Sequence, residues 1–346
     1  MSVGRTISKI DLVVVSENFG VSYSGGSLAT CRLLEHMAPH FNTVTVYCER
    51  DDQSLVDHVR IINYQSESEV LEYLNSVSAP TVIYGDFYKC HFVLNTALPF
   101  YFSYHDNWPE MLELKDDREQ GQSIIEYYQD IFTQAKMIFT VSEYKMPFIR
   151  KSTDRVELIR NGITQWSEIK NKASDTEPYR ILMAGNISHR KCHHLPEILK
   201  QLSTQDLAFT IDLYGNIEDQ VLYEEINSYE LIHHKGYAKS LNYADYDLLL
   251  HTSMMENLSL SVVDAIANET PVVAFDVGGL SEVVQDGING HLVLPYDSTA
   301  MTQAIVSAYS HRDQYKFDRD LTTKFNWATS AKKMVDTIYR TNSIQL

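Results

Sequence analysis

The chain has 346 residues, more than a single hydrophobic core usually serves, so two domains are expected. Its 44% hydrophobic and 22% charged residues are typical of a globular protein, and its net charge of −17 argues against nonspecific nucleic-acid binding. No apolar run is long enough to span a membrane, residues 1–5 do not resemble a signal peptide, and the four cysteines lack metal-ligand spacing, so we expect a cytoplasmic protein with reduced thiols.

The first predicted element is a buried strand at residues 10–15, followed by a loop containing Gly25 and Gly26 and by a helix at residues 28–40. A strand, a glycine-containing loop and a helix in this order form an anion site, because backbone N–H groups approach a ligand closely and a helix N-terminus favours negative charge. A plain turn before a helix is an equally good interpretation of Gly25-Gly26 taken alone.

Strand and helix patterns then alternate up to residue 159. The predicted strands are residues 43–48, 59–63, 80–84, 100–104, 137–141 and 155–159, and the predicted helices are residues 67–77, 87–96, 123–134 and 143–151. This alternation predicts a doubly wound, Rossmann-like domain over residues 1–163.

A second candidate site follows the predicted strand 100–104. His105 and Asp106 lie at its carboxyl end, the edge where open α/β sheets bind ligands. A loop histidine with only a local hydrogen bond is the simpler interpretation; a carboxylate beside the imidazole can also set its tautomer.

One segment of this domain is basic although the whole chain is acidic. Residues 136–160 contain six Lys and Arg against three acids. A solvated face is the expected explanation, and contact with a lipid or an anionic acceptor is the alternative.

The chain then passes into a second domain. Asn161-Gly162 is a turn signal, residues 164–177 are polar and are predicted to be the linker, and residues 178–326 form the second domain. It opens with a strand at 179–184, a loop carrying Arg190 and Lys191, and a helix at 194–202. Two adjacent cations in such a loop can neutralise a diphosphate, whereas an exposed pair on the surface is the alternative.

Further elements follow in the same alternation. The predicted strands are residues 209–214, 232–237, 247–252 and 271–275 with a last strand ending at 293, and the predicted helices are residues 218–228, 299–310 and 327–339.

The most informative stretch is residues 254–275. Glu256 follows a buried strand, Asp264 comes eight positions later, and a short helix and a second buried strand complete a parallel βαβ unit. Eight residues are slightly more than two helical turns, so both carboxylates are predicted to lie along one side of the helix. Core packing with a salt bridge would also explain two such acids.

This stretch resembles the acid-x7-acid signature of retaining glycosyltransferases of the GT-B fold, family 4 (glycosyl transferases group 1). The family has glutamate at both ends and Phe-Gly where this chain has Leu258-Ser259. Lys191 stands at the position of the family's diphosphate-binding lysine, whereas the family's arginine falls on Asn186 and Arg190 is the candidate substitute.

The resemblance implies an α/β protein of the GT-B fold, with two Rossmann-like doubly wound domains facing an interdomain cleft. The first domain binds the acceptor, and the last helix, about residues 327–346, crosses back onto it. Glu256 is expected to bind hydroxyls of the donor sugar and Asp264 those of the ribose. His105 is expected to face the donor sugar and the acceptor. The other donor-binding residues are Gly25, Gly26, Arg190, Lys191, Tyr237, Asn257, Leu258, Ser259 and Leu260.

The implied function is transfer of a hexosyl unit, with retention, from a nucleotide diphosphate sugar to a carbohydrate or lipid-linked glycan acceptor. Polysaccharide or lipopolysaccharide biosynthesis in the cytoplasm, at the inner face of the cell membrane with peripheral contact, is the expected setting. No Asp-x-Asp motif ends a predicted strand, so we expect no metal ion and no cofactor. The alternatives are another GT-B enzyme, such as a nucleotide-sugar epimerase or a phosphorylase, and a non-catalytic nucleotide-sugar-binding partner subunit.

Overall fold

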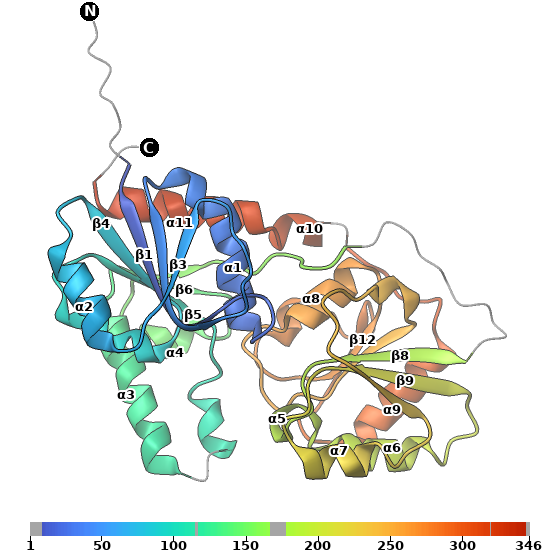
Figure 1. Ribbon diagram of the computed structural model, residues 1–346. Helices are drawn as coiled ribbons and strands as arrows, with labels where there is room; N and C mark the ends of the chain where they lie inside the picture. The colour runs from blue at the N-terminus through green and yellow to red at the C-terminus, as the bar shows by residue number, and fades with distance from the viewer. Residues whose placement is uncertain (1–8, 115–116, 167–177, 319, 344–346) are drawn as a thin grey trace, which may run out of the picture. The chain divides into compact units, whose positions relative to one another are not determined.

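The computed structural model describes residues 9–114, 117–166, 178–318 and 320–343. The chain divides into two compact units, one formed by Met1–Gly162 and Phe325–Leu346 and the other by Ile163–Lys324. Each unit is built around its own parallel β-sheet (Figure 1). The described residues contain no helix that is both long enough and apolar enough to cross a membrane.

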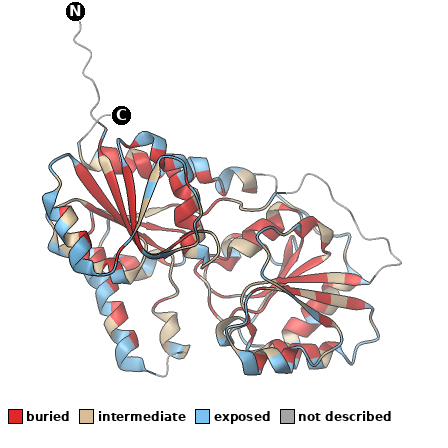
Figure 2. Ribbon diagram, in the orientation of Figure 1, coloured by how far each residue is buried: buried red, intermediate tan, exposed pale blue. Residues whose placement is uncertain are grey.

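The first unit contains a seven-stranded parallel sheet in the order β3-β2-β1-β4-β5-β6-β7. Its strands are β1 (Asp11–Phe19), β2 (Val44–Asp51), β3 (Val59–Asn63), β4 (Thr81–Gly85), β5 (Phe100–Tyr104), β6 (Met137–Thr140) and β7 (Val156–Leu158). Its helices are α1 (Gly25–Met37), α2 (Glu67–Ser76), α3 (Arg118–Gln134), α4 (Met146–Arg150) and α11 (Trp327–Thr341), with 3₁₀ segments at Ala38–His40, Tyr88–Asn95 and Glu110–Leu114. Strands β4 and β5 are buried along their whole length because helices cover both sheet faces, as Figure 2 shows.

Helix α11 comes from the end of the chain and packs against α1 in the first unit. The Tyr339 hydroxyl donates a hydrogen bond to the His40 carbonyl at 2.6 Å, and the Ser330 hydroxyl donates to the Arg160 carbonyl at 2.6 Å. These contacts at both ends of α11 join it to segments more than 150 residues earlier in the sequence.

The second unit contains a six-stranded parallel sheet in the order β10-β9-β8-β11-β12-β13. Its strands are β8 (Tyr179–Ala184), β9 (Phe209–Tyr214), β10 (Ile232–Gly236), β11 (Leu248–His251), β12 (Val272–Phe275) and β13 (Gly290–Val293). Its helices are α5 (His189–Cys192), α6 (Leu195–Leu202), α7 (Gln220–Ile226), α8 (Leu260–Ala267), α9 (Ser298–Ser310) and α10 (Leu321–Lys324), with 3₁₀ segments at Tyr243–Asp245 and Leu280–Glu282.

Several predicted elements differ from the structure, and β1, for example, runs four residues past its predicted end. The helix predicted over residues 87–96 is a 3₁₀ segment, Tyr88–Asn95, which buries Cys90, Phe92 and Val93. Helix α3 begins five residues earlier than predicted, because the Asp117 side chain caps it by accepting from the Gln120 amide at 2.9 Å. Helix α4 covers only five of the nine residues predicted.

The glycine pair before α1 also differs from the predicted loop. Gly25 and Gly26 are the first two residues of the helix itself, because Ser24 and Ser27 form a capping box. The Ser24 hydroxyl accepts from the Ser27 amide at 3.1 Å, and the Ser27 hydroxyl accepts from the Ser24 amide at 3.0 Å. The amides of Gly25 and Gly26 are therefore held at a helix N-terminus.

Candidate functional site

Glu256 lies in the loop between β11 and α8, and a glycine pair from another loop holds that loop in place. Gly278 has a φ of +60°, and a Cβ atom at this position would come within 1.6 Å of the Glu256 carbonyl oxygen. The Gly279 amide donates to the Asn257 carbonyl at 2.9 Å. Only a residue without a side chain fits at 278, so the backbone around Glu256 depends on it.

Because α8 begins only at Leu260, Glu256 and Asp264 are not on one helix. The prediction that both carboxylates lie along one side of a helix is therefore wrong. A polar loop occupies the first part of the interval between them, and each carboxylate has its own partners.

The Glu256 carboxylate is surrounded by basic groups. Its Oε1 lies 3.2 Å from Nη1 of Arg190 and 3.3 Å from Nε2 of His251, and its side chain is 11% exposed. Burial by itself would raise the pKa of Glu256. Arg190, His251 and Lys191 outweigh that effect and hold the pKa below its usual value, so the carboxylate stays ionised.

Arg190 organises the same loop. Its Nη1 donates to the Ser253 hydroxyl at 3.1 Å and to the Met255 carbonyl at 3.0 Å, in addition to Glu256. One nitrogen of the guanidinium fork is thus committed within the second unit. Arg190 orients Glu256 as well as adding positive charge.

Lys191 differs from Arg190 because its ammonium makes no hydrogen bond or ion pair within the described part of the chain. Burial lowers the pKa of Lys191, and the nearby Glu256 carboxylate opposes that shift. Gly185 leaves room for this ammonium, since a Cβ atom at 185 would come within 2.8 Å of the Lys191 Nζ. Lys191 is half-buried, and an ammonium without a partner can donate to an anionic ligand.

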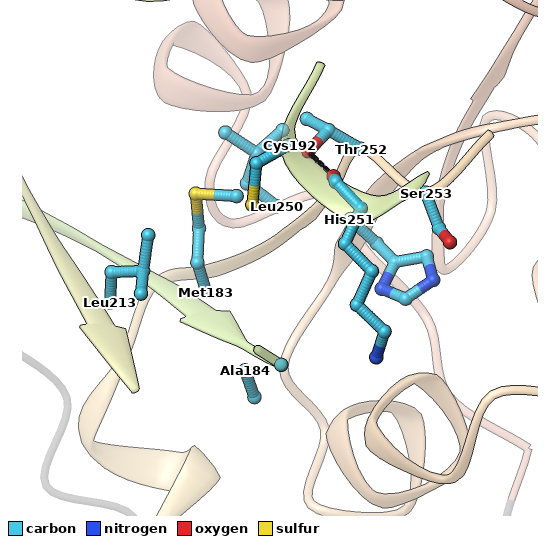
Figure 3. Close-up of a pocket in the computed structure, with 10 residues that line it drawn as sticks. Met183, Ala184, Cys192, Leu213, Leu250, His251, Thr252 and Ser253 are labelled. Atoms are coloured by element: carbon cyan, nitrogen blue, oxygen red, sulfur yellow. Dashed lines mark hydrogen bonds between the residues drawn. The ribbon is translucent and has the colours of Figure 1, made fainter. Parts of the chain in front are cut away.

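A pocket opens beside this cluster at the carboxyl ends of β8 and β11 (Figure 3). It has about 270 Å³ of empty volume, part of it open to solvent, and its lining residues are Met183, Ala184, Gly185, Lys191, Cys192, Leu213, Leu250, His251, Thr252 and Ser253. The Thr252 hydroxyl donates to the Lys191 carbonyl at 2.6 Å, which ties the strand end to the basic loop. The pocket thus combines apolar walls with a few polar groups, as ligand sites do.

The other predicted donor-binding residues lie around α8 and β10. Asn257, Leu258 and Ser259 are buried, the Ser259 hydroxyl lies 3.0 Å from the Ser261 hydroxyl, and Leu260 begins α8. Tyr237 follows β10 directly and is 43% exposed.

Asp264 lies on α8 and is 2% exposed. Its carboxylate accepts from the Thr164 amide at 2.7 Å and from the Gln165 amide at 3.3 Å, and it also accepts from the Thr164 hydroxyl. The predicted ribose contact stays a prediction, and this geometry does not favour it.

In the first unit, the structure brings His105 and Gly26 together. A Cβ atom at Gly26 would lie 3.5 Å from the Cβ of His105, so the start of α1 stands over the end of β5. Burial lowers the pKa of His105 to about 4, and its Nε2 has no hydrogen-bond partner in the described residues. The imidazole is therefore neutral near pH 7.

Asp86 is a carboxylate that the sequence analysis did not single out, and it lies at the end of β4, the strand beside β5. Asp86 follows β4, and its Oδ2 accepts from the Ser16 hydroxyl at 3.1 Å and from the Thr30 hydroxyl at 2.6 Å. Its Oδ1, like Oδ1 of Asn18 at the end of β1, has no partner among the described residues. Burial raises the pKa of Asp86 to about 6. Because β1, β4 and β5 are neighbours, these groups share one edge of the sheet with His105.

Sequence reasoning also missed His251, which ends β11 and is 4% exposed. Its sequence signal is a histidine at the end of a buried strand, five residues before Glu256. Asp86 has a similar signal, as the first residue after the strand 81–85.

The comparisons with known proteins agree with this architecture. Residues 164–323 match the family model of glycosyl transferases group 1. The GtfA subunit of a UDP-N-acetylglucosamine–peptide N-acetylglucosaminyltransferase from Streptococcus pneumoniae is 26% identical over 53% of this chain and 39% of its own length. The O-antigen biosynthesis glycosyltransferase WbnH of Escherichia coli is 26% identical over 49% of each chain. The aligned part thus spans less than half of the length of these curated relatives.

Solved structures match over almost the whole chain. HepE of Anabaena, in complex with UDP-glucose, superposes with a TM-score of 0.77 at 16% identity and covers 96% of this chain and 100% of its own. Sucrose-phosphate synthase of Thermosynechococcus elongatus gives 0.78 at 18% identity over 96% and 98%. The second unit therefore matches the glycosyl transferases group 1 family over residues 164–323, and the chain as a whole has the GT-B fold.

Proposed function

We propose that this protein is a retaining glycosyltransferase, which moves a hexosyl unit from a nucleotide diphosphate sugar to an acceptor hydroxyl. The observation that carries the proposal is the half-buried ammonium of Lys191, which has no hydrogen-bond or ion-pair partner in the described residues and lines the pocket beside the Arg190–Glu256 pair. The relatives' names support it, since they include transferases of N-acetylglucosamine and an O-antigen glycosyltransferase.

In this proposal Lys191 binds the donor diphosphate. A phosphate oxygen would supply the hydrogen-bond acceptor that the ammonium lacks. The Ser259 and Leu260 amides at the start of α8 add hydrogen-bond donors at the positive end of the helix dipole. Together they would stabilise the charge that develops on the departing phosphate, as preorganised donors do in other transferases.

Glu256 binds hydroxyls of the donor sugar. Among the described residues Arg190 and His251 contact Oε1 of the carboxylate, and in this proposal Oε2 accepts from a sugar hydroxyl. Tyr237, exposed after β10, is the proposed neighbour of the base.

The acceptor binds to the first unit, at the edge of the sheet where β1, β4 and β5 end. His105 and Asp86 offer polar atoms without partners among the described residues, and sugar hydroxyls both donate and accept hydrogen bonds. An Asp86→Asn variant should therefore raise the KM for the acceptor while the Kd for the donor nucleotide stays unchanged.

The chemistry proposed needs no protein nucleophile. The bond between the anomeric carbon and the phosphate oxygen breaks, the acceptor oxygen bonds the same carbon from the same face, and the acceptor's proton passes to the departing phosphate. We propose that Lys191, Arg190 and the α8 amides take the place of a divalent ion. Transfer should then be unchanged in excess EDTA, and a loss that Mg²⁺ restores would reject metal independence.

The acceptor class we propose is a carbohydrate or a lipid-linked glycan in bacterial polysaccharide or lipopolysaccharide biosynthesis, at the inner face of the cell membrane. The basic segment 136–160 offers less free charge for a peripheral membrane contact than its sequence indicated. Lys145 is buried against Glu110, and Arg160 pairs with Glu143 at 3.0 Å.

The test is a panel of UDP-, GDP- and ADP-sugars, assayed by thermal shift and by release of nucleotide, with simple methyl glycosides as acceptors. Binding together with transfer and an α-configured product from an α-configured donor supports the proposal. Inversion would reject the retaining mechanism. Binding without turnover would favour the non-catalytic partner subunit, and no binding at all would reject a nucleotide-sugar protein.

A further inference from the structure

One face of α8 is occupied by the segment at which the chain enters the second unit. Asp264 and Asn268 lie four residues apart, one helical turn, and both contact Thr164 or Gln165. Asp264 accepts from both backbone amides of that segment, and the Asn268 side-chain amide donates to the Gln165 carbonyl at 2.7 Å. The segment is thus fastened to α8 through donors and acceptors alike.

The same segment continues to the loop after β10. The Gln165 side chain donates to the Lys239 carbonyl at 3.4 Å and accepts from the Ser240 hydroxyl at 2.9 Å. That loop begins at Tyr237, two residues before Lys239. A continuous set of hydrogen bonds therefore runs from Asp264, through Gln165, to the loop that carries Tyr237.

In this arrangement the Asp264 carboxylate is covered, and three of its roughly four acceptor positions are already used. Its Oδ1 accepts from two amides, its Oδ2 accepts from the Thr164 hydroxyl, and the residue is 2% exposed. A ribose hydroxyl could reach the carboxylate only by displacing Thr164. The shorter side chain of aspartate keeps the carboxylate close to α8, where the segment covers it.

We propose that Asp264 is a positioning residue, which fastens Thr164 and Gln165 to α8 and so sets the loop from Tyr237 to Ser240, and that it does not bind the donor ribose. The part about the ribose rests on the proposed function, because it presupposes a nucleotide in the second unit. The part about the fastened segment does not.

The ribose part is tested with whichever of UDP, GDP or ADP binds best, together with its 2′-deoxy analogue. Kd values are measured for both ligands with the wild type and with Asp264→Asn. We expect the variant to weaken both ligands by the same factor, about 3- to 10-fold, so that their ratio stays constant. If Asp264 binds the ribose, the wild type prefers the ribonucleotide by about tenfold or more and the variant loses that preference, which would overturn the proposal.

A second variant keeps Asp264 and removes only one of its donors. Thr164→Val should lower the melting temperature and raise the nucleotide Kd in the same direction as Asp264→Asn, and the double variant should lose little more than either single one. Additive losses would show that the two residues act separately. A melting temperature that falls while the Kd stays constant would reduce Asp264 to a purely structural role and overturn the positioning part.

The matched control is Asp206→Asn, at an exposed aspartate just before β9. It should change neither the melting temperature nor the nucleotide Kd. If none of the three nucleotides binds the wild type, the proposed function fails. The melting temperatures of the Thr164 and Asp264 variants then still decide whether the segment is fastened as described.

Discussion

The guanidinium of Arg190 and the carboxylate of Glu256 form a pair at 3.2 Å, and the same Arg190 nitrogen also reaches the backbone of the Glu256 loop through the Met255 carbonyl. Arg190 therefore both helps to keep the Glu256 carboxylate ionised and fixes the position of its loop. The pair lies at the carboxyl ends of β8 and β11, beside the pocket.

Replacing Glu256 by glutamine should lower the turnover number about 10- to 100-fold, because a hydrogen bond from a sugar hydroxyl to a charged group is worth about 1.5–3 kcal/mol. Steady-state transfer kinetics check this. Glu230→Gln, an exposed site before β10, is the control and should behave as the wild type. Full activity of Glu256→Gln would remove Glu256 from the proposed site.

Replacing Lys191 by methionine should raise the Kd for a nucleoside diphosphate about tenfold or more, since the half-buried ammonium is the donor proposed for the phosphates. The Kd for the matching nucleoside should change little, because it has no phosphate. Isothermal titration calorimetry measures both. Lys200→Met removes an exposed lysine of α6 and should leave both affinities unchanged. An equal loss for nucleoside and diphosphate would contradict a phosphate contact.

Asp264 should make stability depend on pH. Burial raises its pKa from 3.8 to about 7, although donors from Thr164 and Gln165 oppose the shift. The folded protein therefore binds this proton more tightly than the unfolded chain, so the contribution is fully present below pH 3.8 and is lost as pH rises through about 7. Tyr243, which faces Asp264, stays neutral across this range because its pKa is raised well above 10.

The measurement is the melting temperature of the wild type minus that of Asp264→Asn, from pH 5 to pH 8. We expect this difference to fall as pH rises, since other titrating groups are common to both proteins. A difference that grows with pH would mean that the hydrogen bonds to the carboxylate outweigh its burial.

The pair of Lys145 and Glu110 should contribute to the stability of the first unit. Lys145 is 1% exposed, and its ammonium donates to the Trp108 carbonyl at 2.8 Å as well as contacting Glu110. Lys145→Met should lower stability by about 1–3 kcal/mol, less than for a fully buried pair because Glu110 is 29% exposed. The shift of the urea unfolding midpoint measures it. Lys151→Met, at an exposed site after α4, should shift the midpoint little, and equal shifts would show that the pair adds nothing.

Local patterns predicted most of the strands well. The runs 59–63, 100–104, 179–184 and 209–214 match β3, β5, β8 and β9 residue for residue. For β5, β8 and β9 the reason is that buried parallel strands are short apolar runs bounded by polar turns, whereas β3 is an edge strand without a buried residue. Helix starts were harder to predict, as at α1 and α3, since a side-chain cap decides them.

The residues of the candidate site also differ in whether the sequence could predict them. Glu256, Arg190 and Lys191 could be proposed from sequence because each stands directly after a predicted strand or in the loop that follows one. His251 and Asp86 carried the same signal, yet a polar residue at a strand end is common, and only their contacts with Glu256 and with Ser16 and Thr30 distinguish them.

The sequence by itself determined two parallel α/β units and the loops in which anion-binding residues lie, because periodicity and turn residues act over short stretches of chain. Only the tertiary structure decided what those residues contact. Asp264 shows the difference: its spacing from Glu256 pointed to a shared helix face, but its partner is Thr164, 100 residues away in the sequence. A hydrogen bond between such distant residues depends on how α8 packs, and no local pattern encodes that packing.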